Sequence, residues 1–139
     1  MRMLARGARV GLTAVAVFTG SLTLAGPANA ASSPIEACGG GSYHEIDHHD
    51  IDGARIDLLY NGKTNCVVTW KTKYVGKKTF VSALVSTGSN RVKSDPGQYE
   101  FYAGPVKLDA AGQCIRWAGG AGPGTGATDV WFSQPGHCG

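Results

Sequence analysis

The four cysteines of this 139-residue chain constrain its fold more than any other feature. They are Cys38, Cys66, Cys114 and Cys138, and an even number in a short exported chain indicates disulfides rather than free thiols. Four cysteines allow three pairings, and the sequence does not decide strictly among them. We favour Cys38 with Cys66 and Cys114 with Cys138, because each bond then closes a loop of roughly 25 to 29 residues. In the chain-entropy estimate, each bond stabilises the folded state by about 3 kcal/mol. A four-cysteine zinc site would need two close C-x-x-C pairs, which this spacing does not provide.

Residues 1–30 have the three parts of a secretory signal peptide. Three arginines precede an apolar stretch over 10–24, and Ala28-Asn29-Ala30 provides the small residues of a cleavage site. A membrane-spanning helix needs roughly 20 predominantly apolar residues, so this stretch is too short for one. We expect cleavage after Ala30, which leaves one secreted domain of residues 31–139 without membrane attachment.

Removal of that segment changes the charge of the chain. The full sequence has 13 Lys and Arg against 10 Asp and Glu, and three of the arginines lie in the signal. The remaining domain is therefore close to neutral, which gives no argument for nucleic acid or an anionic membrane as a partner. Lysines 71, 73, 77 and 78 form a cluster that we interpret as a solvated strand edge.

The part of the chain after residue 53 alternates β-rich runs with Gly, Asn and Pro, and no window has a helical period. We expect an all-β fold, a small antiparallel sandwich or partly closed barrel of about seven or eight short strands stapled by the disulfides. Strands are expected over 54–60, 65–74, 79–87, 98–103, 106–108, 113–117 and 129–132. Turns are expected at 61–62, 88–90 and 94–97. The Gly-rich tract 118–126 lacks the spacing of a phosphate-binding loop and is predicted to be a flexible loop.

The segment 43–52 carries three of the four histidines and four acidic residues, which raises the question of a metal site. The candidate ligands are His44, His48, His49 and Asp50, since imidazole and carboxylate suit zinc, copper or nickel. On a regular strand His44 and His48 project from the same face. The segment has no known metal-site spacing, so we favour a solvated strand end and expect no cofactor.

A second pattern in the same region is similar to small secreted guanyl-specific ribonucleases. Tyr43-His44-Glu45 is followed by Gly53-Ala54-Arg55, and the resemblance implies that Glu45 is a general base and Arg55 a phosphate clamp. That family also has a helix-bearing segment upstream and a general-acid histidine on a later strand. Only about a dozen residues separate the cleavage site from Tyr43, and after Arg55 the sole histidine of the sequence is His137, beside a C-terminal cysteine. A nuclease that uses Glu45 therefore stays a remote alternative.

Several segments together carry a resemblance to another family. They are residues 58–61, 65–69, 71–73, 75–76, 102–108, 114–117 and 137–139. In this order they span nearly the whole of 31–139, and as a set they resemble the spore-associated protein A family of filamentous, spore-forming actinobacteria. The resemblance implies a secreted protein found with spores or aerial hyphae, and it brings no catalytic residues.

We therefore expect a non-enzymatic extracellular protein whose partner is a component of the spore or hyphal surface. The alternative is a secreted binding module for a surface glycan or a protease. An exposed coplanar pair among Trp70, Tyr102 and Trp131 would favour glycan binding, although large aromatics usually lie in the core. A protruding loop bridged by Cys114 and Cys138 would favour protease inhibition. A concave site with convergent ionisable groups would favour a hydrolase.

Overall fold

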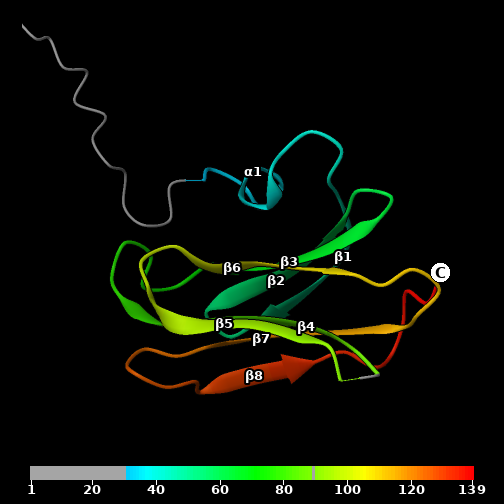
Figure 1. Ribbon diagram of the computed structural model, residues 1–139. Helices are drawn as coiled ribbons and strands as arrows, with labels where there is room; N and C mark the ends of the chain where they lie inside the picture. The colour runs from blue at the N-terminus through cyan, green and yellow to red at the C-terminus, as the bar shows by residue number, and fades with distance from the viewer. Residues whose placement is uncertain (1–30, 89) are drawn as a thin grey trace, which may run out of the picture.

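The computed structural model describes residues 31–88 and 90–139, which form two antiparallel four-stranded sheets facing each other, with a short helix outside the first sheet (Figure 1). The expected signal segment 1–30 lies outside the described residues. The elements are α1 (Pro34–Cys38), β1 (His44–Ile51), β2 (Ala54–Tyr60), β3 (Thr64–Lys71), β4 (Thr79–Thr87), β5 (Val92–Tyr99), β6 (Tyr102–Asp109), β7 (Ile115–Ala121) and β8 (Asp129–Phe132). The first sheet has the order β1-β2-β3-β6 and the second β5-β4-β7-β8. The predicted all-β sandwich is confirmed.

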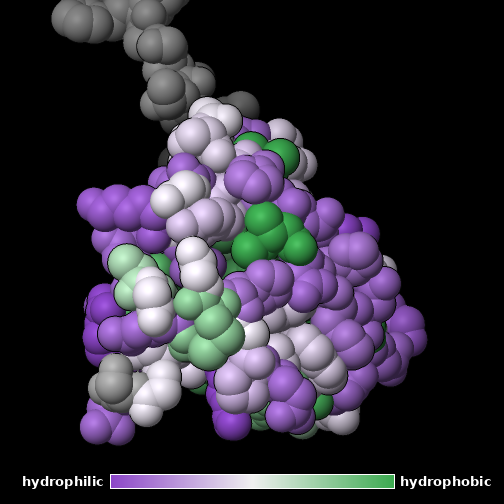
Figure 2. Space-filling model, turned by 90° about the vertical axis from the view of Figure 1, so that its right-hand side faces the viewer, coloured by the Kyte–Doolittle hydropathy of each residue, from purple (hydrophilic) through white to green (hydrophobic). Residues whose placement is uncertain are grey.

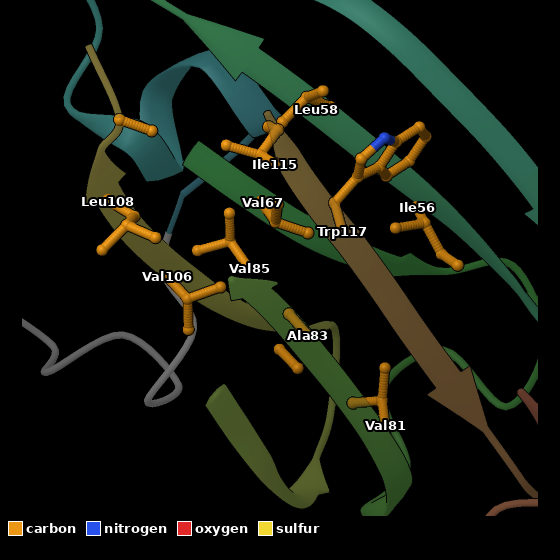
Figure 3. Close-up of a cluster of buried hydrophobic side chains, with 12 residues drawn as sticks. Ile56, Leu58, Val67, Val81, Ala83, Val85, Val106, Leu108, Ile115 and Trp117 are labelled. Carbon is orange, nitrogen blue, oxygen red and sulfur yellow. The ribbon is translucent and has the colours of Figure 1, made fainter. Parts of the chain in front are cut away.

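The main core lies between the two sheets, as Figure 3 shows. Strand β4 alternates buried and half-buried residues along its whole length, which is typical of a strand with one face on the core. Strands β2 and β3 are instead buried on both faces over most of their length. The side chains of this core include Ile56, Leu58, Val67, Val81, Ala83, Val85, Val106, Leu108, Ile115 and Trp117. The outer face of the first sheet therefore needs a second cover.

Helix α1 provides that cover over part of the outer face (Figure 1). The Ser33 side chain accepts a hydrogen bond from the Glu36 amide at 3.1 Å, and Gly39 ends the helix with a φ of 119°. A helix of five residues does not hold its shape by its own hydrogen bonds, so packing and covalent attachment decide its position. Beneath it lies a second buried cluster of Cys38, Leu59, Cys66, Val68 and Tyr102.

The two disulfides join Cys38 to Cys66 and Cys114 to Cys138, which is the pairing that the loop lengths favour. The first ties α1 to β3, and the second ties the start of β7 to the C-terminal residues. An isolated β-bridge between Ile115 and Gly136 lies beside the second bond. The described part of the chain contains no helix with the length and apolarity that a membrane crossing requires.

The turn predicted at 94–97 is wrong, because these residues lie within β5. A proline interrupts a ladder only where its missing N–H was needed, and β5 is an edge strand, so Pro96 is tolerated opposite Ser82. The Asp95 carboxylate accepts hydrogen bonds from the Tyr99 hydroxyl and from the Gly104 amide, the latter at 2.9 Å. The bond from Gly104 joins β5 to the first part of β6.

The flexible loop predicted over 118–126 is wrong for its first four residues, which form the end of β7 and are buried. The reason is packing between the sheets: a Cβ atom on Gly119 would lie 2.5 Å from Thr69 Oγ1 and 2.7 Å from Ile56 Cγ1. Small residues in β7 let β2 and β3 approach at this point. Low side-chain volume was interpreted as flexibility, whereas here it permits close packing.

The interpretation of Lys71 as part of a solvated strand edge is also wrong, because its side chain is buried, with 3% of the residue exposed. Its ammonium donates hydrogen bonds to the carbonyl oxygens of Tyr74 and Tyr99 at 2.9 Å and of Lys77 at 2.5 Å. Burial lowers the pKa of Lys71 below its ordinary value. The charge is kept inside the protein because three carbonyl oxygens solvate it.

Replacing Gly119 by alanine should destabilise the protein, because the new methyl group overlaps Thr69 and Ile56. The expected loss is about 1 to 3 kcal/mol in the free energy of unfolding. The matched control is Gly124→Ala, where an added Cβ meets nothing within 4 Å. Denaturant unfolding of both variants checks this, and equal stabilities would contradict the packing role of Gly119.

Candidate functional site

Strand β1 contains a bulge that decides where its histidines and acids point. Glu45 lies opposite Leu59 and Asp47 opposite Leu58, so the register shifts between them. Residues directly opposite each other on antiparallel strands share a face of the sheet. Glu45 and His48 therefore both lie on the outer face with Leu59, whereas His44 and Asp47 lie on the inner side.

The expectation that His44 and His48 share a face is consequently wrong, since the bulge adds a residue between them. His48 Nδ1 lies 3.3 Å from Glu45 Oε1, and the His49 ring stacks on Trp131 with a centroid distance of 4.0 Å. Asp50 is exposed on β1 opposite Arg55. No group of three His, Cys, Asp or Glu side chains among residues 31–88 and 90–139 is arranged to hold a metal ion.

Three charged side chains do converge on the outer face of the first sheet. The Arg55 guanidinium donates to Glu45 Oε1 through Nη2 at 2.5 Å and to Asp57 Oδ1 through Nε at 2.8 Å. Asp57 is 3% exposed, and its other oxygen, Oδ2, is buried without a hydrogen-bond donor. We call Glu45, Arg55 and Asp57 the charged trio.

The environment moves the pKa values of the two carboxyls apart. Burial raises the pKa of Asp57 to about 6, and the neighbouring Glu45 carboxyl adds to the rise while Arg55 opposes it. Burial acts in the same direction on Glu45, but its interactions with Asp57 and with the Arg55 guanidinium outweigh burial and leave the pKa of Glu45 below its ordinary value. Both carboxyls raise the pKa of Arg55 by their hydrogen bonds. Asp57 is therefore the group of the trio that takes up a proton near neutral pH.

A groove of about 310 Å³ opens beside the charged trio on the outer face. Ser33, Pro34 and Ile35 at the start of α1 line it together with the trio, Leu59, Trp70 and Thr72. The groove exists because α1 is short and covers only part of this face. It combines apolar walls with a few polar groups, which is typical of sites for small ligands.

Trp70 is the aromatic wall of this groove. Its ring stacks on Tyr102 with a centroid distance of 4.8 Å and an interplanar angle of 10°. Tyr102 is 6% exposed, so it is the buried partner, whereas Trp70 is half-buried and reaches the groove. The two rings do not form the exposed coplanar pair considered above, but Tyr102 holds the indole of Trp70 in a fixed plane.

Trp131 belongs to a different hollow at the edge between β1 and β8. It packs edge-on against Trp117 and stacks on His49, while His137 Nε2 lies 3.2 Å from Asp47 Oδ2. Because Asp47 and Glu45 lie on opposite sides of β1, the His137 pair does not join the charged trio. The end of the molecule shown in Figure 2 is mostly hydrophilic, with apolar colour limited to small patches.

The sequence pattern pointed to Glu45 and Arg55 but missed Asp57 and the role of Trp70. Arg55 and Asp57 lie two residues apart on β2, so they share one face of the strand, opposite the face of Ile56 and Leu58. A cover from α1 over the same face was not predictable from periodicity. The one available signal was Leu59, an apolar residue that continues the face of Arg55 and Asp57.

The charged trio can accept hydrogen bonds but offers little to an anion. Both nearest acceptors of the Arg55 guanidinium are carboxylates of this chain, so the trio has a net charge of −1 when both are ionised. A phosphate clamp needs positive charge aimed at the ligand. The geometry therefore suits donors such as ammonium or hydroxyl groups.

The Asp57 carboxyl should titrate with a midpoint of about 6. In Glu45→Gln the midpoint should fall, because the variant loses a negative charge next to Asp57. The matched control Glu100→Gln removes the same charge in the turn between β5 and β6, outside the charged trio, and should leave the midpoint unchanged. Carbon NMR of labelled aspartate side chains measures this, and an ordinary midpoint in the wild type would contradict the site geometry.

Comparison with known proteins gives one relationship. The chain is 36% identical over 118 residues to spore-associated protein A of Streptomyces coelicolor, which covers 78% of this chain and 75% of that relative. No family model matches the chain, and no solved structure matches it. Identity at this level over most of both sequences is sufficient to assign a family. The chain belongs to the spore-associated protein A family.

Proposed function

We propose that this chain is a secreted, non-enzymatic protein that associates with a component of the spore or aerial-hypha surface. The observation that carries the proposal is its membership of a family whose relative is named for spore association. The signal pattern supports export, with removal of residues 1–30 and release of residues 31–139 as the mature domain. The two disulfides are consistent with an oxidising compartment outside the cytoplasm.

Within this function, a binding role for a surface glycan is favoured over protease inhibition. The groove beside Trp70 combines an aromatic wall with polar side chains, which is the composition that a small polar ligand needs. The Cys114–Cys138 bond lies where β7 begins and the chain ends, and the hairpin between them is part of the second sheet. Protease inhibition would favour a protruding loop held rigid by this disulfide. The residues between the two cysteines instead form β7 and β8 of the second sheet.

The nuclease alternative is weaker because the two carboxylates of the trio occupy the guanidinium that would clamp phosphate. The groove does bring ionisable groups together in a concave site, which a hydrolase requires, so hydrolase activity is worth testing. However, the groove contains Glu45, Asp57 and Arg55 but not His137, which contacts Asp47 instead. The general-acid histidine of the nuclease alternative is therefore not beside Glu45. We therefore assign Glu45 a role in ligand binding and in holding Arg55.

Fractionation of a sporulating culture should place the protein in the spore-surface wash, with a mass that corresponds to residues 31–139 and no free thiol. A chain without residues 1–30 should stay in the cytoplasm and provides the control for leakage. Recovery of the mature protein only from the medium, and failure of purified protein to rebind washed spores, would contradict surface association.

Purified wild type and Glu45→Gln should show the same background rate on RNA, because Arg55 is already paired. Cleavage by the wild type that the variant loses would show that the protein is an enzyme and that the non-enzymatic proposal is wrong. The variant keeps the shape of residue 45, so a loss of activity would not follow from a change in packing.

A further inference from the structure

The groove on the outer face contains an acceptor that has no donor within the protein. Asp57 Oδ2 is buried and unpaired, whereas Oδ1 accepts from Arg55 Nε at 2.8 Å. A buried acceptor without a donor costs free energy, so a ligand that supplies one gains affinity. Asp57 lines the groove, but Oδ2 is closed to solvent while the groove is empty, so a donor reaches it only when the side chains around it shift.

The charge around Asp57 selects the kind of donor. His48 lies directly opposite it on β1, Glu45 contacts both His48 and Arg55, and Arg55 lies two residues from Asp57 on the same strand. The β3 residues opposite, Val68 and Trp70, are uncharged. With both carboxyls ionised the trio has a net charge of −1, which favours an ammonium over a neutral or anionic group.

The rest of the groove selects the body of the ligand. Trp70 presents an indole fixed by its stack on Tyr102, and Pro34 and Ile35 form the wall from α1. An aromatic ring in a fixed plane suits the flat apolar face of a pyranose and also attracts a nearby cation. At about 310 Å³ the groove is near the lower end of small-ligand sites, roughly 300 to 1,000 Å³, and so suits one sugar ring.

We infer that this groove binds a saccharide with a free amino group, with the ammonium at Asp57 and Glu45 and the pyranose ring against Trp70. The inference rests on the proposed function, because it names the chemistry of the surface component. It distinguishes a deacetylated amino sugar from its N-acetylated form, which has the same ring but no positive charge.

The same geometry links binding to a proton. While the groove is empty, a proton on Asp57 relieves the repulsion between the carboxylates of Asp57 and Glu45. A bound ammonium takes over that role, so the proton leaves when the ligand binds. Binding near pH 6 should therefore release protons, and affinity should fall as the pH drops below about 6. Release of protons on binding is a readout that a merely structural Asp57 would not give.

The test is calorimetric titration of the mature protein with a four-unit oligosaccharide of glucosamine, compared with the fully N-acetylated oligosaccharide of equal length. The glucosamine form should bind at least tenfold more tightly. Asp57→Asn should lose about 10- to 100-fold in affinity because it removes the charge that pairs with the ammonium. Trp70→Leu should lose about tenfold.

The matched control is Asp50→Asn, which removes the same charge from the neighbouring strand but does not line the groove. It should bind like the wild type, and thermal melting should show that all variants are folded. Equal affinity for the two oligosaccharides, or full binding by Asp57→Asn, would overturn the inference. Equal affinity for spermidine would overturn the saccharide part, since a general amine site needs no sugar ring.

Rebinding of the same proteins to washed spores separates this inference from the proposed function. If the wild type and Asp57→Asn rebind equally and neither binds the glucosamine oligosaccharide, the inference is wrong while surface association holds. If the oligosaccharide binds as expected but no protein rebinds spores, the groove is correct and surface association is wrong.

Discussion

The disulfide between Cys38 and Cys66 is the constraint on which the outer face of the first sheet depends. Strands β2 and β3 carry apolar side chains on both faces, and one of those faces has no second sheet to cover it. A five-residue helix is too short to fold on its own, so the covalent bond keeps it over Leu59 and Val68. Because the cover is short, it leaves the groove open next to it, and its first residues become one wall of that groove.

A second constraint comes from the bulge in β1, which turns Glu45 and His48 to the same face. Without the extra residue, side chains three positions apart on a strand would point to opposite faces. The bulge therefore allows Glu45 to meet Arg55, and Arg55 in turn holds Asp57. The raised pKa of Asp57 follows from burial together with that arrangement. The backbone bulge thus affects the chemistry of the site through Glu45.

The sequence was sufficient for the sheet architecture and insufficient for the site, for physical reasons. Strand alternation, turn residues and paired cysteines act over short distances along the chain, and they predicted the all-β sandwich correctly. The bulge, the buried Asp57 and the closely packed Gly119 depend on contacts between segments far apart in sequence. Lys71 was misinterpreted for the same reason, since the carbonyl oxygens that solvate it belong to neighbouring loops and strands.

The ammonium of Lys71 has a consequence for local opening of the structure. It joins the carbonyl oxygens of Tyr74 and Lys77 in one loop to that of Tyr99 at the end of β5. If either segment opened alone, the buried Lys71 ammonium would lose some of its hydrogen-bond acceptors. The free energy of opening one segment therefore includes the loss of its bonds to Lys71, which also loosens the other segment. We therefore expect the loop and the strand end to open as one cooperative unit, with backbone amides that exchange with solvent together.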